Sequence, residues 1–112
     1  MELTKEQRTV IEVLGYTYLR VGEFDKAERI FKGLEAVYPD DMKNKRYLAY
    51  LSTVKGDAAS ALSLLSECLD TGMMRSSDAP LLLIQAKALW SLGRKGESKD
   101  IFDRYLLLID QH

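Results

Sequence analysis

The chain has 112 residues, of which 46% are hydrophobic, so it can bury one core but has room for only one domain, over residues 1–112. Its sixteen basic and seventeen acidic side chains are interspersed and leave a net charge of −1, which argues against a nucleic-acid-binding surface. The single cysteine, Cys68, excludes an internal disulfide and is expected to be buried. Because no apolar run has the length of a signal peptide or of a membrane span, we expect a cytoplasmic protein without membrane insertion.

The first two predicted helices form a hairpin. Thr4-Lys5-Glu6-Gln7 has the form of a capping box, which predicts a helix from about residue 5 to residue 21. Gly22 ends this helix, and a second helix is predicted from residue 24 to residue 38, where Pro39 stops it. The residues predicted to form the core are Val10, Ile11, Leu14, Tyr18, Val21, Ala27, Ile30, Phe31 and Leu34.

The spacing in this hairpin matches the tetratricopeptide (TPR) pattern L-G-x-x-Y, A-x-x-x-F, P, which describes two antiparallel helices in about 34 residues. The matching residues are Leu14, Gly15, Tyr18, Ala27, Phe31 and Pro39. Small residues at Gly15 and Ala27 let the two helices approach closely, while the aromatic side chains fill the wider gaps. The hairpin therefore reads as one TPR-like repeat.

The turn at Gly22 recurs in degenerate form at Gly56 and at Gly93, so the sequence predicts three repeats. Their expected bounds are about residues 8–41, 42–78 and 79–112. Three repeats are close to the minimum for a continuous core. The predicted fold is all-α, with about six helices in three tandem hairpins that form a short right-handed superhelix with a concave groove.

The second repeat predicts helices over about residues 42–55 and 58–71, with Asp40 and Asp41 capping the first of them. The residues expected to face inward are Tyr47, Leu48, Leu51, Val54, Ala61, Leu62, Leu65, Cys68 and Leu69. The start of this repeat also carries a basic cluster, formed by Lys43, Lys45 and Arg46. We interpret this cluster as a solvated helix start rather than a phosphate site.

A longer polar loop is predicted over residues 72–78, where Met73 and Met74 either anchor the loop or belong to a binding rim. The third repeat then predicts a helix that Ser77 or Asp78 caps and that runs to about residue 92. A last helix follows over about residues 95–110.

The sequence offers no constellation for catalysis or for a cofactor. His112 is the only histidine, so neither a Ser/His/Asp nor a Cys/His arrangement can form. No P-loop, G-x-G-x-x-G, paired C-x-x-C or H-E-x-x-H motif is present. We therefore expect a binding protein rather than an enzyme, with no cofactor and no metal.

In TPR arrays the first helices of successive repeats line the concave groove, and the groove positions lie off the core stripe. Here they form an aromatic and aliphatic surface with a basic rim, which suits an extended or helical peptide with apolar anchors. The predicted groove residues are Glu12, Tyr16, Leu19, Arg20, Arg46, Tyr50, Thr53, Leu83, Lys87 and Trp90. In the alternative interpretation, Trp90 and one of the tyrosines pack into the core.

The last predicted helix carries a second apolar surface, wider than one neighbouring helix needs. Its residues are Ile101, Phe102, Tyr105, Leu106, Leu108 and Ile109. TPR arrays usually finish with a polar-faced helix, and no such helix is expected here. A partner protein, a second copy of the chain or Leu3 folding back is expected to cover this surface.

The chain resembles the YscY (SctY) family of type III secretion chaperones over nearly its whole length. The resemblance is carried by five segments and by the order of three repeats without a final capping helix. The segments are Leu3-Thr4-Lys5-x-Gln7, the L-G-x-x-Y hairpin, Arg46-x-Leu48-Ala49, Gly56-Asp57 and Phe102-x-x-Tyr105-Leu106.

The resemblance implies a bacterial cytoplasmic chaperone that binds a small secreted protein of the YscX type and delivers it to the export gate at the inner membrane, without a cofactor. A homodimer is expected in the absence of that partner. The alternatives are a general TPR adaptor or scaffold, a needle-subunit co-chaperone or a translocator chaperone, although translocator chaperones have longer chains. Adaptors for heat-shock chaperone tails carry Lys and Asn where this chain has Glu12 and Tyr16, which argues against that type.

Overall fold

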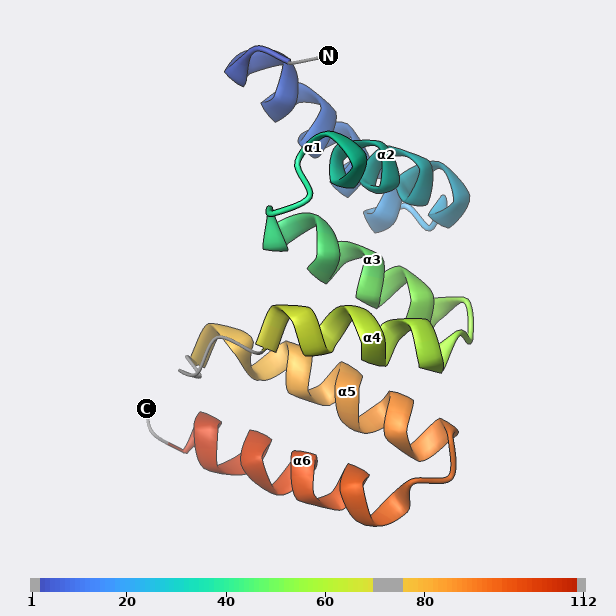
Figure 1. Ribbon diagram of the computed structural model, residues 1–112, viewed down its shortest axis with the longest axis vertical. Helices are drawn as coiled ribbons and strands as arrows, with labels where there is room; N and C mark the ends of the chain where they lie inside the picture. Colours follow the sequence, from blue (N-terminus) through green and yellow to red (C-terminus); the bar gives the residue numbers. More distant parts are fainter. Residues whose placement is uncertain (1–2, 70–75, 111–112) are drawn as a thin grey trace. The chain divides into compact units, whose positions relative to one another are not determined.

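A computed structural model describes residues 3–69 and 76–110, and every regular element in these two ranges is helical (Figure 1). The elements are α1 (Lys5–Arg20), α2 (Phe24–Val37), α3 (Met42–Val54), α4 (Ala58–Leu69), the short 3₁₀ helix η1 (Ser76–Asp78), α5 (Ala79–Ser91) and α6 (Lys95–Ile109). The predicted all-α fold of helical hairpins is confirmed. The predicted loop with Met73 and Met74 lies outside the described residues, apart from its last part in η1.

The chain divides into two compact units, residues 1–48 and 49–112. The boundary falls inside α3, so the first unit holds α1, α2 and the start of α3, and the second unit holds the rest of α3 with α4, α5 and α6. The single domain and the superhelical groove that the sequence suggests stay predictions. None of the described helices is long and apolar enough to cross a membrane.

The same turn closes all three helical hairpins, as the repeat pattern predicts. Gly22, Gly56 and Gly93 have φ angles of +83°, +82° and +79°, a conformation that strains any residue with a Cβ atom. In the first turn the Gly22 N–H donates to the Leu19 carbonyl and the Glu23 N–H donates to the Tyr18 carbonyl. This pair of bonds is a Schellman cap, and it recurs at Gly56 and Gly93.

In the first unit α1 and α2 pack closely around Gly15, the one buried residue of α1. A Cβ atom at this position would lie 2.8 Å from Ile30 Cγ2 and 2.9 Å from Phe31 Cζ. Only glycine therefore fits here without displacing the Ile30 and Phe31 side chains, as the small residue of the TPR pattern implies. On α2 the predicted inward residues Ala27, Phe31 and Leu34 are buried, and Ile30 is half-buried.

The predicted core stripe of α1 is wrong for three residues. Val10 and Val21 are 66% and 67% exposed, and Leu14 is exposed as well. The side of α1 that packs is centred on Gly15, about a quarter of a turn from the predicted stripe. The reason is steric, because α2 approaches α1 most closely where a side chain is missing rather than where the largest apolar side chains stand.

The capping predictions hold at α1 and at α3, whereas Asp78, the N-cap residue of α5, makes no side-chain capping hydrogen bond. Thr4 and Gln7 form the reciprocal capping box, and the Asp41 carboxylate accepts a hydrogen bond of 2.9 Å from the Lys43 backbone N–H. The basic cluster is only partly solvated. Lys45 is buried because its ammonium group pairs with the Glu35 carboxylate and donates to the Pro39 carbonyl at 2.9 Å. The interpretation of the whole cluster as a solvated surface was wrong at Lys45.

In the second unit α5 packs between α4 and α6 (Figure 1). Cys68 is buried on α4 as predicted, and Val54 is exposed at the end of α3, contrary to its predicted place in the core. The α5–α6 contact is fixed by a buried hydrogen bond of 2.7 Å from Ser98 Oγ to the Ala86 carbonyl oxygen. Buried leucines of α5 complete this core.

Candidate functional site

The most distinctive surface of the second unit is an open apolar hollow of about 390 Å³ on the α5–α6 hairpin. It is lined by Leu83, Ala86, Lys87, Trp90, Lys95, Ser98, Lys99 and Phe102. The three groove residues that the sequence predicts for the third repeat, Leu83, Lys87 and Trp90, therefore lie together. Trp90 is 58% exposed, so the alternative in which it packs into the core is wrong. We call this surface the α5–α6 hollow.

All ionisable side chains that line the α5–α6 hollow are lysines. The Lys95 ammonium lies 4.8 Å from the centroid of the Trp90 ring, within the range of a cation–π interaction. Lys99 forms an ion pair of 2.9 Å with Asp103, whose carboxylate accepts its hydrogen bond and raises the pKa of the lysine. The hollow is therefore an aromatic and aliphatic floor with a positive rim. Sequence analysis missed the contribution of Lys95, Lys99 and Phe102 because it assigned the groove to first helices only.

A second hollow of about 360 Å³ lies where α4, α5 and α6 meet, and its charges are balanced. Arg94 and Arg104 line it together with Glu97 and Asp100. Arg94 donates two hydrogen bonds to Glu97, of 2.6 and 2.8 Å, which lower the pKa of the carboxyl and raise the pKa of the guanidinium. Because Arg94 already pairs with Glu97, and Arg104 and Asp100 carry opposite charges, this hollow is a weaker candidate for a charged ligand.

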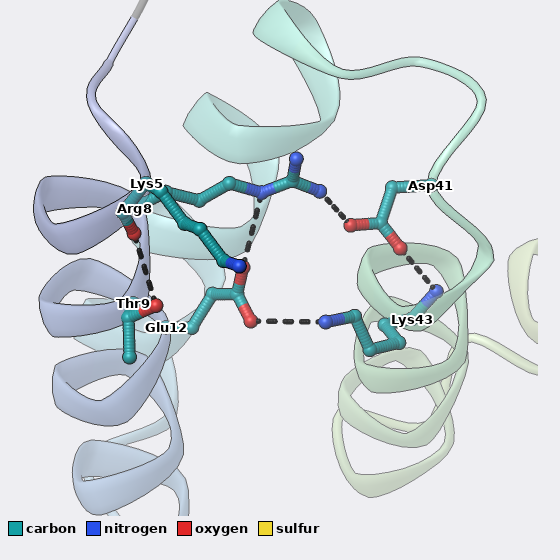
Figure 2. Close-up of polar contacts among 6 residues, drawn as sticks. All are labelled: Lys5, Arg8, Thr9, Glu12, Asp41 and Lys43. Carbon is teal, nitrogen blue, oxygen red and sulfur yellow. Dashed lines mark hydrogen bonds and ion pairs between the residues drawn. The ribbon is translucent and has the colours of Figure 1, made fainter.

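In the first unit Glu12, a predicted groove residue, is part of an ion-pair cluster that joins α1 to the start of α3 (Figure 2). Its two carboxylate oxygens lie 3.1 Å from Arg8 Nε and 3.2 Å from Lys43 Nζ. Arg8 also pairs with Asp41, and its guanidinium lies 3.8 Å from the centroid of the Tyr38 ring. The carboxylate of Glu12 is thus already engaged within its own unit.

The other predicted groove residues of the first unit include one exposed aromatic ring. Tyr16 is exposed, and its ring meets the Tyr47 ring edge-on at 6.2 Å. Arg20 is exposed beside it, with Nη1 at 3.5 Å from the Tyr16 hydroxyl oxygen. Leu19 and Arg46 are half-buried. Tyr16 and Arg20 therefore form a small accessible surface on α1.

The two predicted groove residues on the second-unit part of α3 differ in accessibility. Tyr50 is exposed, whereas Thr53 is half-buried and its hydroxyl donates to the Ala49 carbonyl at 3.0 Å. That Tyr16 and Tyr50 share a groove stays a prediction, since they belong to different units.

The predicted C-terminal apolar face of α6 is partly open. Leu106 and Ile109 are exposed, and Ile101, Tyr105 and Leu108 are half-buried. The rings of Phe102 and Tyr105 stack at 5.8 Å, which connects this face to the α5–α6 hollow. Leu107 is the most exposed apolar residue of the helix at 67%, although the sequence did not place it on the face. Leu3 lines a separate shallow hollow with Glu6, Gln7, Val10 and Ile11.

Comparison with models of known protein families found no match, and comparison with curated proteins found none. Among residues 3–69 and 76–110, no three His, Cys, Asp or Glu side chains come close enough to hold a metal ion. What the geometry offers in the second unit is an exposed aromatic and aliphatic hollow on α5 and α6.

Proposed function

We propose that this chain is a protein-binding helical-repeat module and that the α5–α6 hollow is its main contact surface. The observation that carries the proposal is the exposure of Trp90, Leu83 and Phe102 around one hollow. Aromatic side chains in a concave, water-excluding setting are the residues that most often dominate protein–protein affinity. The apolar face of α6 extends the same surface through Tyr105 and Leu106.

The resemblance to the YscY family narrows this proposal to a bacterial secretion chaperone. In this role the chain binds a small secreted protein of the YscX type in the cytoplasm, keeps it soluble and delivers it to the export gate. A chaperone of this kind needs an exposed apolar surface that matches the apolar surface of its substrate. No nucleotide or cofactor takes part in such binding.

A tagged pull-down from the native cells tests this function, with mass spectrometry to identify bound proteins and light scattering to measure their ratio. One small secreted protein at a fixed ratio would support the chaperone. Several unrelated cytosolic partners would favour a general adaptor, whereas the absence of any partner would contradict both functions.

Paired variants test the contact surface in the same experiment. Trp90→Ala should weaken partner binding by roughly thirtyfold, the loss typical of a hot-spot residue worth about 2 kcal/mol. Arg104→Ala, in the charge-balanced hollow, should leave binding nearly unchanged. Both residues are exposed, so circular dichroism should show that the two variants keep the same helical content. Equal losses of binding would exclude the α5–α6 hollow as the contact surface.

A further inference from the structure

The two hairpins α1–α2 and α5–α6 present equivalent surfaces when they are aligned on their turn glycines, Gly22 and Gly93. In this alignment Phe31 corresponds to Phe102. Phe31 is fully buried, and the ring of Tyr47, from the start of α3, stacks on it with centroids 4.5 Å apart and planes 18° apart. The first hairpin thus shows what this surface accepts, namely a helix that lays an aromatic ring on the phenylalanine.

On the second hairpin the equivalent surface is open. Phe102 is 44% exposed and lines the α5–α6 hollow, whose wall consists of α5 and α6 residues alone. The small residues beneath are also equivalent, since Ala86 and Ser98 stand where the first hairpin has Gly15 and Ala27. The hollow is therefore the site at which one more helix fits the repeat geometry.

The charge of the two surfaces differs, and this difference selects the occupant. Lys87 corresponds to Tyr16, Lys95 to Phe24 and Lys99 to Glu28 in the first hairpin. The change places three ammonium groups around the hollow with no carboxylate in its lining, and of these Lys99 already pairs with Asp103 just outside it. Carboxylates on a bound helix would meet these groups, whereas a basic helix would be repelled.

Symmetry argues against a second copy of the chain as the occupant. A two-fold dimer through the hollow places the same patch of both copies face to face. Lys87, Lys95 and Lys99 of one copy would then oppose the same three lysines of the other, which is unfavourable when like charges lose water.

We propose that the α5–α6 hollow binds one acidic amphipathic helix of a protein partner. The helix places an aromatic side chain on Phe102 and directs carboxylates toward Lys87, Lys95 and Lys99. This assignment rests on the proposed protein-binding function and names the chemistry of the partner segment. It uses the helix-in-groove mode, in which apolar anchors one turn apart on the helix give affinity and the charged rim gives specificity.

A direct test uses Trp90, the only tryptophan of the chain, as a fluorescent reporter inside the hollow. The probes are three side-chain-bridged helical peptides of about 18 residues, or five turns, with the same leucine stripe. The first carries one tyrosine in the stripe and glutamates on both flanks, the second replaces the glutamates by lysines, and the third replaces the tyrosine by alanine. The acidic tyrosine peptide should shift the Trp90 emission to shorter wavelength in a saturable way, because binding removes water from the ring.

The basic peptide should bind at least about tenfold more weakly than the acidic one, and added salt should reduce this difference. The alanine peptide should also bind more weakly, since it cannot stack on Phe102. Equal binding of the acidic and basic peptides, or no emission change with any of them, would overturn the assignment. Light scattering on dilution measures whether the chain self-associates. If it does, and if the self-associated form does not bind the peptide, the assignment would be overturned in favour of a second copy.

Matched variants of the full chain separate this inference from the proposed function. Lys87→Gln combined with Lys99→Gln should lower affinity for the acidic peptide by about tenfold, whereas Arg94→Gln combined with Arg104→Gln, in the charge-balanced hollow, should not. The same variants are then used to capture the cellular partner. Capture that is unaffected by the lysine changes would leave the protein-binding function standing and overturn the acidic helix. Failure of the wild-type chain to capture any partner would overturn the function itself.

Discussion

The first and the last hairpin of the described chain solve the same packing problem with different residues. In α1–α2 the close approach depends on Gly15 beneath Ile30 and Phe31, whereas in α5–α6 it depends on Ala86, whose carbonyl accepts a hydrogen bond from Ser98. Steric fit holds the first contact and a buried polar bond holds the second. A repeat can therefore lose its glycine and keep its hairpin.

The two hairpins differ more in whether another helix covers their equivalent phenylalanines. The first hairpin receives Tyr47 on Phe31, and ion pairs from Arg8 and Glu12 hold the start of α3 beside it (Figure 2). In the last hairpin Phe102 and Trp90 are exposed, and both line the open α5–α6 hollow, which has lysines at its rim. The same repeat position thus belongs to the core in one hairpin and to an exposed hollow in the other.

Truncation of the two equivalent phenylalanines, Phe31 and Phe102, should give the largest difference in stability between the hairpins. Phe31→Ala removes a fully buried, stacked ring and should destabilise the first unit by about 3–5 kcal/mol, enough to unfold it if that unit is marginally stable. Phe102→Ala removes a ring that already meets water and should have a much smaller effect, about 1 kcal/mol. Urea unfolding followed by circular dichroism measures both. Similar losses would show that Phe102 is as much a core residue as Phe31.

The sequence predicted the local features of the fold well, because each depends on residues close together in the chain. The capping box at Thr4, the turn at Gly22 and the small residue at Gly15 all have the geometry that their residue types require. The positions of Leu83, Lys87 and Trp90 on one side of α5 also follow from helical spacing alone.

The features that the sequence did not predict depend on contacts between residues distant in the chain, and a helical wheel contains no information about such contacts. The wheel placed Val10 in the core because it counts apolar side chains, whereas the packed side of α1 is set by where α2 approaches. Lys45 looked solvated because Glu35 and the Pro39 carbonyl, its partners, belong to another helix and a turn. The α6 half of the α5–α6 hollow was missed because the predicted groove was assigned to the first helices of the repeats only.

A smaller contrast is expected between two glycines of the first hairpin. Gly15→Ala introduces a Cβ atom within 3 Å of Ile30 and Phe31, and the resulting overpacking should destabilise the protein by about 1–3 kcal/mol. Gly33→Ala is the matched control, since it lies in the same hairpin with open space around its Cβ position. This control should stabilise the protein by about 0.5–1 kcal/mol through helix propensity. Thermal unfolding gives both values, and a neutral Gly15→Ala would show that the hairpin tolerates wider spacing.

The ion-pair cluster of the first unit should contribute less to the free energy of unfolding than the packing at Phe31 or at Gly15. A double-mutant cycle of Glu12→Gln and Lys43→Gln should give a coupling free energy of about 0.2–1 kcal/mol, because Lys43 is well exposed to solvent. The coupling should fall as salt is added, since ions screen exposed pairs. Urea unfolding at low and high salt measures it. A coupling that does not change with salt would mean that the pair is shielded from solvent.

The smallest effect concerns the start of α4, where the middle turn differs from the two others. Asp57 accepts hydrogen bonds from the Ser60 hydroxyl, at 2.6 Å, and from the Ser60 backbone N–H, at 3.1 Å, whereas Glu23 and Arg94 make no side-chain capping bond at the equivalent positions. These two bonds hold the pKa of the Asp57 carboxyl below its ordinary value of 3.8, and the bond from the hydroxyl has the larger effect. Because the folded pKa is the lower one, the stabilisation is complete above the unfolded pKa and is lost as pH falls through the folded pKa.

Asp57→Asn should remove this pH dependence while keeping an oxygen that can cap the helix. The melting temperature of the variant should therefore lie slightly below that of the wild-type chain at neutral pH, and the difference should vanish once the pH falls below the folded pKa of Asp57. Ser60→Ala is the control that removes only the hydroxyl donor, and it should raise the pKa of Asp57 toward its ordinary value. Carboxyl titration by NMR follows the pKa directly. A difference in melting temperature that persists through the acid range would assign the effect to helix propensity rather than to the charge at the cap.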